Sequence, residues 1–155
     1  MDDDKAVSIN RRAFFNYEIL EKYEVGIVLK GTEVKSIRQG QVNLRDSFGR
    51  IEGGEVYVLN LHISPYAQGS INNVSPTRTR KLLLHKGEIK RLVGKVSQKG
   101  LTLIPIRLYF KENLVKIELA LAKAKKVYDK REKIKKRELE REIRRSSKRS
   151  VTGGE

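Results

Sequence analysis

Clusters of basic residues, two of them beside aromatic residues, are the groups in this 155-residue chain most able to do chemistry. They are Arg78–Lys81, Arg11 and Arg12 before Phe14, Phe15 and Tyr17, and Lys123–Lys126 before Tyr128. Lys and Arg side chains bind phosphates, and unstacked RNA bases stack on aromatic rings or on guanidinium planes. The clusters therefore predict binding to RNA.

The aromatic residues have a second interpretation, because rings also pack in protein cores. We expect Phe14 and Phe15 to pack in the core. For Tyr17 and Tyr23, core packing and RNA contact both stay open. Tyr128 has few apolar residues around it in the sequence, so we expect it on the surface.

Residues typical of enzyme sites are sparse. The chain has no cysteine, which excludes disulfides, thiolate zinc sites and thiol catalysis. No Ser/Asp arrangement that suggests a triad accompanies His62 or His85, and no Gly-rich phosphate-binding motif is present. We therefore expect a protein that is not an enzyme, with no cofactor and no metal site.

The net charge of +15 points to a polyanionic partner, and RNA and DNA are the most abundant polyanions of the cytosol. An anionic membrane surface is the weaker alternative, because no strongly amphipathic face of Trp, Phe and Leu is visible. No apolar run approaches the ~20 residues that a spanning helix needs. The acidic start at Met1–Lys5 is not a secretory signal, so we expect a cytoplasmic protein.

The charge is divided unevenly along the chain. Residues 1–122 hold 20 basic and 13 acidic side chains, whereas residues 123–155 hold 14 and 6 and carry a net charge of +8. Acid–base pairs four residues apart, such as Glu132 and Lys136, favour a helix in this tail by only ~0.2–0.5 kcal/mol each. We predict a folded domain over 1–122 and a basic tail over 123–155. The tail is expected to be disordered when free and helical against a polyanion; a solvated charged helix without a partner is the alternative.

Short runs of alternating polarity predict strands in residues 1–122. Glu24–Leu29 and Val115–Leu121 have apolar residues at every second position. Gly53-Gly54 and Lys111–Asn113 each separate two such runs, which predicts two hairpins. Gln41–Arg45 predicts one more short strand.

Helices and loops complete the predicted fold. Gly87–Val96 has apolar residues at helical spacing, Glu33–Arg38 predicts a short helix with Thr32 as N-cap, and the polar segment Asn72–Arg80 predicts a loop. About six short strands with small helices predict a mainly β fold, an OB-like closed antiparallel β-barrel with flanking short helices and a basic C-terminal tail. Closure protects strand edges, and barrels of this kind often bind oligonucleotides.

Five longer motifs follow one another along the chain. They are YEVGIVLKGTEVKS at 23–36, NLHISPY at 60–66, RTRKLLLH at 78–85, KGLTLIP at 99–105 and AKAKKVYDKR at 122–131. Together they closely resemble the small protein B family, the tmRNA-binding (SsrA-binding) proteins of bacterial trans-translation. The resemblance runs from about Asn10 to Arg145, nearly the whole chain.

The resemblance implies an RNA-binding adaptor. Family members are OB-like barrels that bind the tRNA-like domain of tmRNA and deliver alanyl-tmRNA to stalled ribosomes for ribosome rescue and peptide tagging. The implied partners are tmRNA, 16S rRNA and the ribosome, with elongation factor Tu reached indirectly through alanyl-tmRNA. The implied protein is a monomer with no membrane partner, and its tail occupies the decoding centre and the empty mRNA channel.

Site residues follow from the motifs and the basic clusters. The tmRNA-binding candidates are Asn10, Arg11, Tyr17, Glu24, Arg78, Arg80, Lys81, Leu83, His85, Lys123 and Lys125. The candidates for the decoding centre and mRNA channel are Lys126, Tyr128, Asp129, Lys130, Arg131, Lys135, Lys136, Arg137, Arg141, Arg144 and Arg145. Glu24 cannot bind phosphate, but its carboxylate accepts hydrogen bonds from a guanine edge or a 2′-OH.

Two other functions fit the composition. The first is a structural ribosomal or assembly protein that uses a barrel and a basic tail on rRNA; unlike it, an adaptor dissociates from most ribosomes and prefers a tRNA-like RNA. The second is a nuclease or RNA-modifying enzyme. The missing cluster of catalytic residues argues against it.

Overall fold

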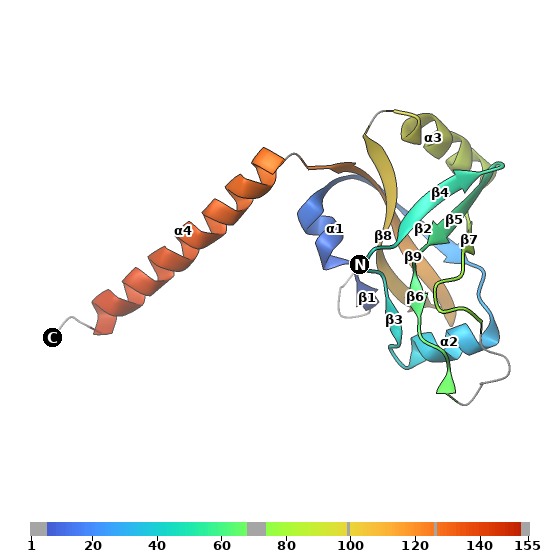
Figure 1. The fold of residues 1–155 in the computed structure, drawn as a ribbon, viewed down its shortest axis with the longest axis horizontal. Helices are drawn as coiled ribbons and strands as arrows, with labels where there is room; N and C mark the ends of the chain where they lie inside the picture. Colours follow the sequence, from blue (N-terminus) through green and yellow to red (C-terminus); the bar gives the residue numbers. More distant parts are fainter. Residues whose placement is uncertain (1–5, 68–73, 99, 126, 153–155) are drawn as a thin grey trace. The chain divides into compact units, whose positions relative to one another are not determined.

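Two of the long ring strands, β8 (Leu101–Lys111) and β9 (Leu114–Ala124), form one hairpin (Figure 1). They pair from Leu101↔Lys123 to Lys111↔Leu114. The turn holds Glu112 and Asn113 at φ 50° and 66°, the left-handed conformation that tight hairpin turns need. The hairpin predicted around residues 111–113 is therefore confirmed.

The structure is a computed structural model that describes residues 6–67, 74–98, 100–125 and 127–152. It divides the chain into two units, Met1–Ala124 and Lys125–Glu155. The division falls two residues after the predicted boundary, because β9 continues to Ala124 and pairs there with Tyr17, the first residue of β2 (Tyr17–Ile27).

Seven strands form one antiparallel sheet in the order β1-β8-β4-β5-β7-β2-β9. Because β9 also pairs with β8, six of them close into a ring, and β1 lies outside it against β8 (Figure 1). The strands not yet given bounds are β1 (Ala6–Ile9), β4 (Phe48–Glu52), β5 (Glu55–Leu59) and β7 (Arg80–Leu83), with β3 (Val42–Asn43) and β6 (His62–Ile63) in a separate sheet. The predicted mainly β architecture of about six closed antiparallel strands is confirmed.

Four helices are present among the described residues: α1 (Arg11–Asn16), α2 (Gly31–Arg38), α3 (Lys86–Val96) and α4 (Val127–Thr152). The predicted helix at 87–96 is confirmed by α3. Helix α2 begins earlier than predicted, since its N-cap is Lys30, whose backbone N–H donates to Glu33 Oε1 at 2.8 Å. Helix α1 is too short to show a helical period and is capped by Asn10.

Strand β7 replaces the end of the loop predicted over Asn72–Arg80. It pairs with β5 on one side and β2 on the other. Arg80 and Lys81 therefore lie in the ring, with side chains on opposite faces. The strand predicted over Gln41–Arg45 is shorter than expected, because only Val42 and Asn43 pair with β6.

The ring is packed on its inside and, at one end, also on its outside. The inner cluster includes the fully buried residues Leu82, Leu92 and Ile117. A second cluster lies under α1 and consists of Ala13, Ile104, Ile106, Ala120 and Ala122, with Phe14 and Tyr17 packed against it. Core packing of Phe14 is thus confirmed, and Tyr17 is half-buried on the same cluster.

Gly49 lies where β4 crosses β8, and only a residue without a side chain fits there. A Cβ at Gly49 would come within 2.8 Å of Leu103 Cβ, and both atoms belong to rigid paired strands. Overpacking of this kind costs about 1–3 kcal/mol. We expect Gly49→Ala to lower the free energy of unfolding by that amount in a denaturant titration. Gly87→Ala, whose Cβ would meet nothing within 4 Å, is the matched control; an equal loss there would contradict the steric explanation.

The tail forms helix α4, from Val127 to Thr152. Its described apolar side chains, Ile134, Leu139 and Ile143, are all exposed. A single helix whose described apolar side chains are all exposed is marginal in water, because nucleation is costly and these side chains contribute no packing. The disorder expected of the free tail stays a prediction.

Candidate nucleic-acid interface

Glu33 binds the two arginines of the 78–81 cluster. Arg78 donates from Nε and Nη2 to the Glu33 carboxylate, the shortest contact being 2.5 Å, and Arg80 Nε donates to Glu33 Oε2 at 2.5 Å. Arg80 also donates to the carbonyl oxygens of Leu61 and Pro76, at 2.6 and 3.0 Å.

This network decides which cations of the cluster can reach a ligand. Arg80 is 0% exposed, so its guanidinium cannot contact RNA in this conformation. Burial raises the pKa of Glu33, but the bonds from Arg78, the Lys30 N–H and Arg80 outweigh it and hold that pKa below its usual range. The pair therefore stays charged, and Arg80 is a structural residue of the ring.

Lys81 and Leu83, the alternate residues of β7, lie on the outside. Leu83 is 52% exposed, and Lys81 pairs with Glu55 at 3.4 Å. His85 is exposed at the N-cap of α3, where its backbone N–H donates to Glu88 Oε1 at 3.1 Å. The alternation of the strand thus buries Arg80 and Leu82 and presents Lys81 and Leu83.

Glu24 belongs to the same outer surface. Tyr109 Oη donates to Glu24 Oε2 at 2.6 Å, and Lys111 Nζ lies 3.0 Å from Oε1. The bonds from Tyr109 and Lys111 lower the pKa of Glu24, so its carboxylate is ionised. Burial and the bond to Glu24 raise the pKa of Tyr109, which keeps its hydroxyl protonated as the donor.

Register brings Glu24 and Leu83 onto one face. Gly26, two residues after Glu24, pairs with Leu83, and a Cβ at Gly26 would lie 3.3 Å from Leu83 Cβ. Glu24 is also directly opposite Glu118 in β9. We call this surface the outer face; it consists of Lys22, Glu24, Lys81, Leu83, Arg107, Lys111 and Glu118, together with the hydroxyl of the buried Tyr109, which is bonded to Glu24.

The outer face contains a cavity of about 260 Å³, lined in part by Glu24, Glu118 and Arg107. Glu118 accepts from Arg107 at 2.9 Å and pairs with Lys22 at 3.4 Å. The cavity is therefore lined by both donors and acceptors, which suits the edge of a nucleobase and its ribose.

Sequence reasoning missed Tyr109, Arg107 and Glu118. A usable signal was present, because Arg107 and Tyr109 place polar groups at alternate positions of the otherwise apolar run 103–110. What the sequence lacked was the pairing that sets Tyr109 beside Glu24, 85 residues away.

The N-terminal candidates divide between interior and surface. Asn10 is 6% exposed, and its Nδ2 donates to the carbonyl oxygens of Leu44 and Pro105 while its Oδ1 caps α1. Arg11 is exposed on α1, and Tyr17 packs on the second cluster. Asn10 is therefore placed to fix the start of α1 rather than to touch a ligand.

The remaining candidates lie at the end of β9 and in the tail. Lys123 is exposed in β9, and Lys125 follows that strand. Arg131, Lys135, Lys136, Arg137, Arg141, Arg144 and Arg145 are exposed on α4. Lys126 and the side chains of Tyr128, Asp129 and Lys130 are outside what the structure describes.

Two other kinds of site were sought over the described ranges. Within them, no group of three or more His, Asp or Glu side chains is placed to hold a metal ion. None of the helices in these ranges has both the length and the apolar character to cross a membrane.

Known proteins resemble this chain over most of its length. The family model SmpB protein matches residues 7–149. An SsrA-binding protein of Carboxydothermus hydrogenoformans is 64% identical over 90% of this chain and 94% of its own, and one of Caldicellulosiruptor saccharolyticus is 59% identical over 95% and 93%.

A solved structure agrees. The chain is similar, with a TM-score of 0.66 and 59% identity over 77% of this chain and 84% of the other, to a structure described as "tmRNA-SmpB: a journey to the center of the bacterial ribosome". The family model and these relatives, together with the closed ring and its outer face, show that the chain belongs to the SmpB family.

Proposed function

We propose that this protein is a non-enzymatic adaptor that binds the tRNA-like domain of tmRNA and delivers alanyl-tmRNA to stalled ribosomes for trans-translation. The observation that carries the proposal is family membership at 56–64% identity to SsrA-binding proteins. Its site of action is the ribosome in the cytoplasm. Elongation factor Tu is an indirect partner, because it binds the alanyl-tmRNA and not this protein.

The outer face is the proposed contact with tmRNA. Glu24 accepts hydrogen bonds from a guanine edge or a 2′-OH, and Leu83 packs on sugar or base. The exposed residues Arg11, His85 and Lys123 and the half-buried residues Lys81 and Lys125 supply further contacts, the cations among them by binding phosphates. Arg80 and Asn10 act through the fold, since their polar groups are bonded inside the protein, and the half-buried Arg78 is held by Glu33.

The tail is the proposed contact with the ribosome. Tyr128–Arg131 would meet the decoding centre and 16S rRNA, with Tyr128 stacking on a base. The cations from Lys135 to Arg145 would line the empty mRNA channel, where phosphates compensate their charge. A helix with exposed cations on all sides suits such a channel better than it suits a protein core.

Binding to a transcript of the tRNA-like domain tests the outer face. We expect Glu24→Gln to weaken binding by about tenfold, because hydrogen bonds to a charged group contribute about 1.5–3 kcal/mol. Tyr109→Phe removes the hydroxyl that orients Glu24, and we expect a loss of about threefold. Glu52→Gln, an exposed carboxylate on the β4–β5 hairpin, is the control.

Salt dependence supplies an independent check of the same binding. The logarithm of the affinity should fall linearly with the logarithm of salt concentration, by about 0.7–0.9 for each phosphate neutralised. Equal affinity of the protein for an RNA hairpin of the same length would refute the proposed contact. Equal affinities of Glu24→Gln, Glu52→Gln and the unchanged protein for the tRNA-like domain would refute it as well.

A further inference from the structure

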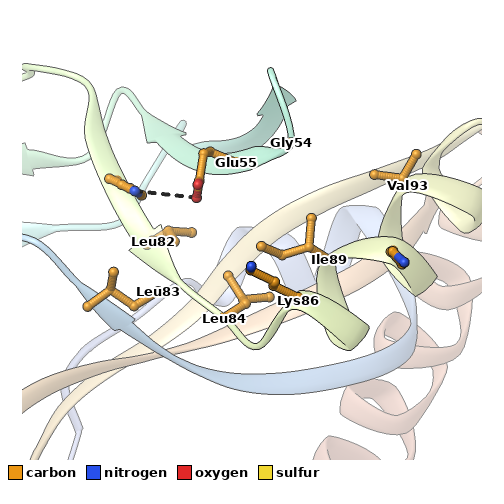
Figure 2. A pocket seen from close by; sticks show the side chains of 10 residues that line it. Gly54, Glu55, Leu82, Leu83, Leu84, Lys86, Ile89 and Val93 are labelled. Atoms are coloured by element: carbon orange, nitrogen blue, oxygen red, sulfur yellow. Dashed lines mark ion pairs between the residues drawn. The ribbon is translucent and has the colours of Figure 1, made fainter.

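An apolar groove lies between helix α3 and the tip of the β4–β5 hairpin (Figure 2). Its volume is about 550 Å³, within the range of ~300–1,000 Å³ typical of binding sites. Leu83 and Leu84 contribute from β7 and the residue after it, and Ile89 and Val93 from α3. Val93 is 46% exposed, and contiguous open apolar surface of this kind marks interaction sites.

One wall of the groove is a single face of α3. Lys86, Ile89, Lys90 and Val93 are spaced i, i+3, i+4 and i+7, so their side chains lie in one row. The opposite side of α3 is anchored, because Leu92 is fully buried and Lys95 binds Glu21 of β2. The wall is therefore held in place before any partner arrives.

The rim of the groove is cationic. Lys81 is compensated by Glu55, the ion pair drawn in Figure 2. Lys86 and Lys90 are exposed, and neither has an ion-pair partner among the residues that the structure describes. The helical wall therefore offers two positive charges beside the apolar row of Ile89 and Val93.

The lining indicates what binds. RNA bases stack on aromatic rings or planar guanidinium groups, and the described lining has neither, being aliphatic with Lys, Glu and Gly. Aliphatic walls instead take aliphatic side chains, and unpaired lysines attract carboxylates. A second copy of this chain, with its net charge of +15, would oppose like charge.

We propose that the groove binds an acidic amphipathic helix of a partner protein, with aliphatic side chains on one face and Asp or Glu beside them. This is the helix-in-groove mode, in which anchors at i, i+3 or i+4 and i+7 enter an apolar channel. The row from Lys86 to Val93 is about 10 Å long at 1.5 Å per residue, which matches two turns of such a helix. The groove shares Lys81 and Leu83 with the outer face, whereas Lys86, Ile89, Lys90 and Val93 belong to the groove alone.

Fluorescence anisotropy with a labelled synthetic peptide tests the groove in the full-length protein. The probe is a 16-residue peptide of Glu, Ala and Leu whose leucines are spaced i, i+3, i+4 and i+7. A peptide of the same composition with leucines spread around the helix is its control. We expect the patterned peptide to bind at least about tenfold more tightly, because only its leucines enter the groove together.

Variants of α3 locate the site. Val93→Glu, and Lys86→Glu combined with Lys90→Glu, should each weaken the patterned peptide by about tenfold or more. Arg91→Glu reverses the same charge on the same helix without lining the groove and should change binding less than about threefold. All four positions are exposed, so unfolding midpoints should be unchanged.

Three results would overturn the proposal. The first is equal affinity for the patterned and the control peptide. The second is an equal loss of peptide affinity in Arg91→Glu and in the groove variants. The third is displacement of the peptide by a tRNA-like RNA, together with a lower affinity of Val93→Glu for that RNA. The last result would make the groove an RNA site. Because peptide binding is measured without RNA, failure here is distinguishable from failure of the proposed function.

Discussion

A protein that ends at Lys126 should bind the tRNA-like domain of tmRNA within about threefold of the full chain and yet support no peptide tagging on stalled ribosomes. The outer face belongs entirely to the unit Met1–Ala124. The deleted residues 127–155 carry 11 basic and 6 acidic side chains. Their loss removes general electrostatic attraction, which salt screens, rather than the contacts of the outer face.

The two functions are measured separately, as affinity for the RNA at physiological salt and as tagged peptide in a reconstituted translation system. A tail with Lys135, Lys136, Arg137 and Arg141 changed to Gln is the informative companion, because it keeps the length and helix propensity and removes the charge. Tagging lost in both proteins assigns the role to the cations. If RNA affinity and tagging were lost in parallel, RNA binding and ribosome function would not belong to separate parts of the chain.

Glu33→Gln should lower the free energy of unfolding by about 3–5 kcal/mol, the loss typical when one partner of a buried ion pair is removed. Arg80 has no exposed surface, and Glu33 is its only carboxylate partner among the described residues. The neutral amide would leave the guanidinium buried without a counter-charge. Denaturant unfolding measures the loss. Because Glu33 of α2 is bonded to Arg80 of β7, we expect α2 and the ring to unfold together in one transition.

Glu55→Gln is the matched control for this substitution. Glu55 also pairs with a cation of β7, Lys81, at 3.4 Å, but both side chains are about two-fifths exposed. Exposed pairs contribute about 0–1 kcal/mol, so the change should be small. If the two variants lost equal stability, burial of the Glu33 network would not be the cause.

The same carboxylate should shape the response to acid. The pKa of Glu33 is lower in the folded protein than its ordinary value of about 4.3. Its contribution to stability is therefore complete above that value and is lost as the pH falls through the lower folded pKa. We expect the unfolding free energy of the wild type to fall more steeply than that of Glu33→Gln below about pH 4.3. Parallel acid curves would contradict this assignment.

Much of the fold follows from local patterns. The alternation of Val115–Leu121 and the turn at Lys111–Asn113 predict the β8–β9 hairpin, because side-chain direction in a strand repeats every two residues. Apolar spacing predicts α3, and the concentration of charge after residue 122 predicts a separate basic tail. The five motifs, in their order along the chain, were sufficient to predict the family, which the family model confirms.

Only the tertiary structure decided which side chains bind one another. Arg78, Arg80 and Lys81 look alike in sequence, but pairing of β7 between β5 and β2 points Arg80 inward and Lys81 outward. Glu33 meets Arg80 across 47 residues and Tyr109 meets Glu24 across 85. Periodicity is a property of neighbouring residues, whereas strand order and register depend on closure of the whole ring. The sequence by itself determined the charge, the family and most of the elements; closure of the ring decided which cations are buried and which lie on the outer face.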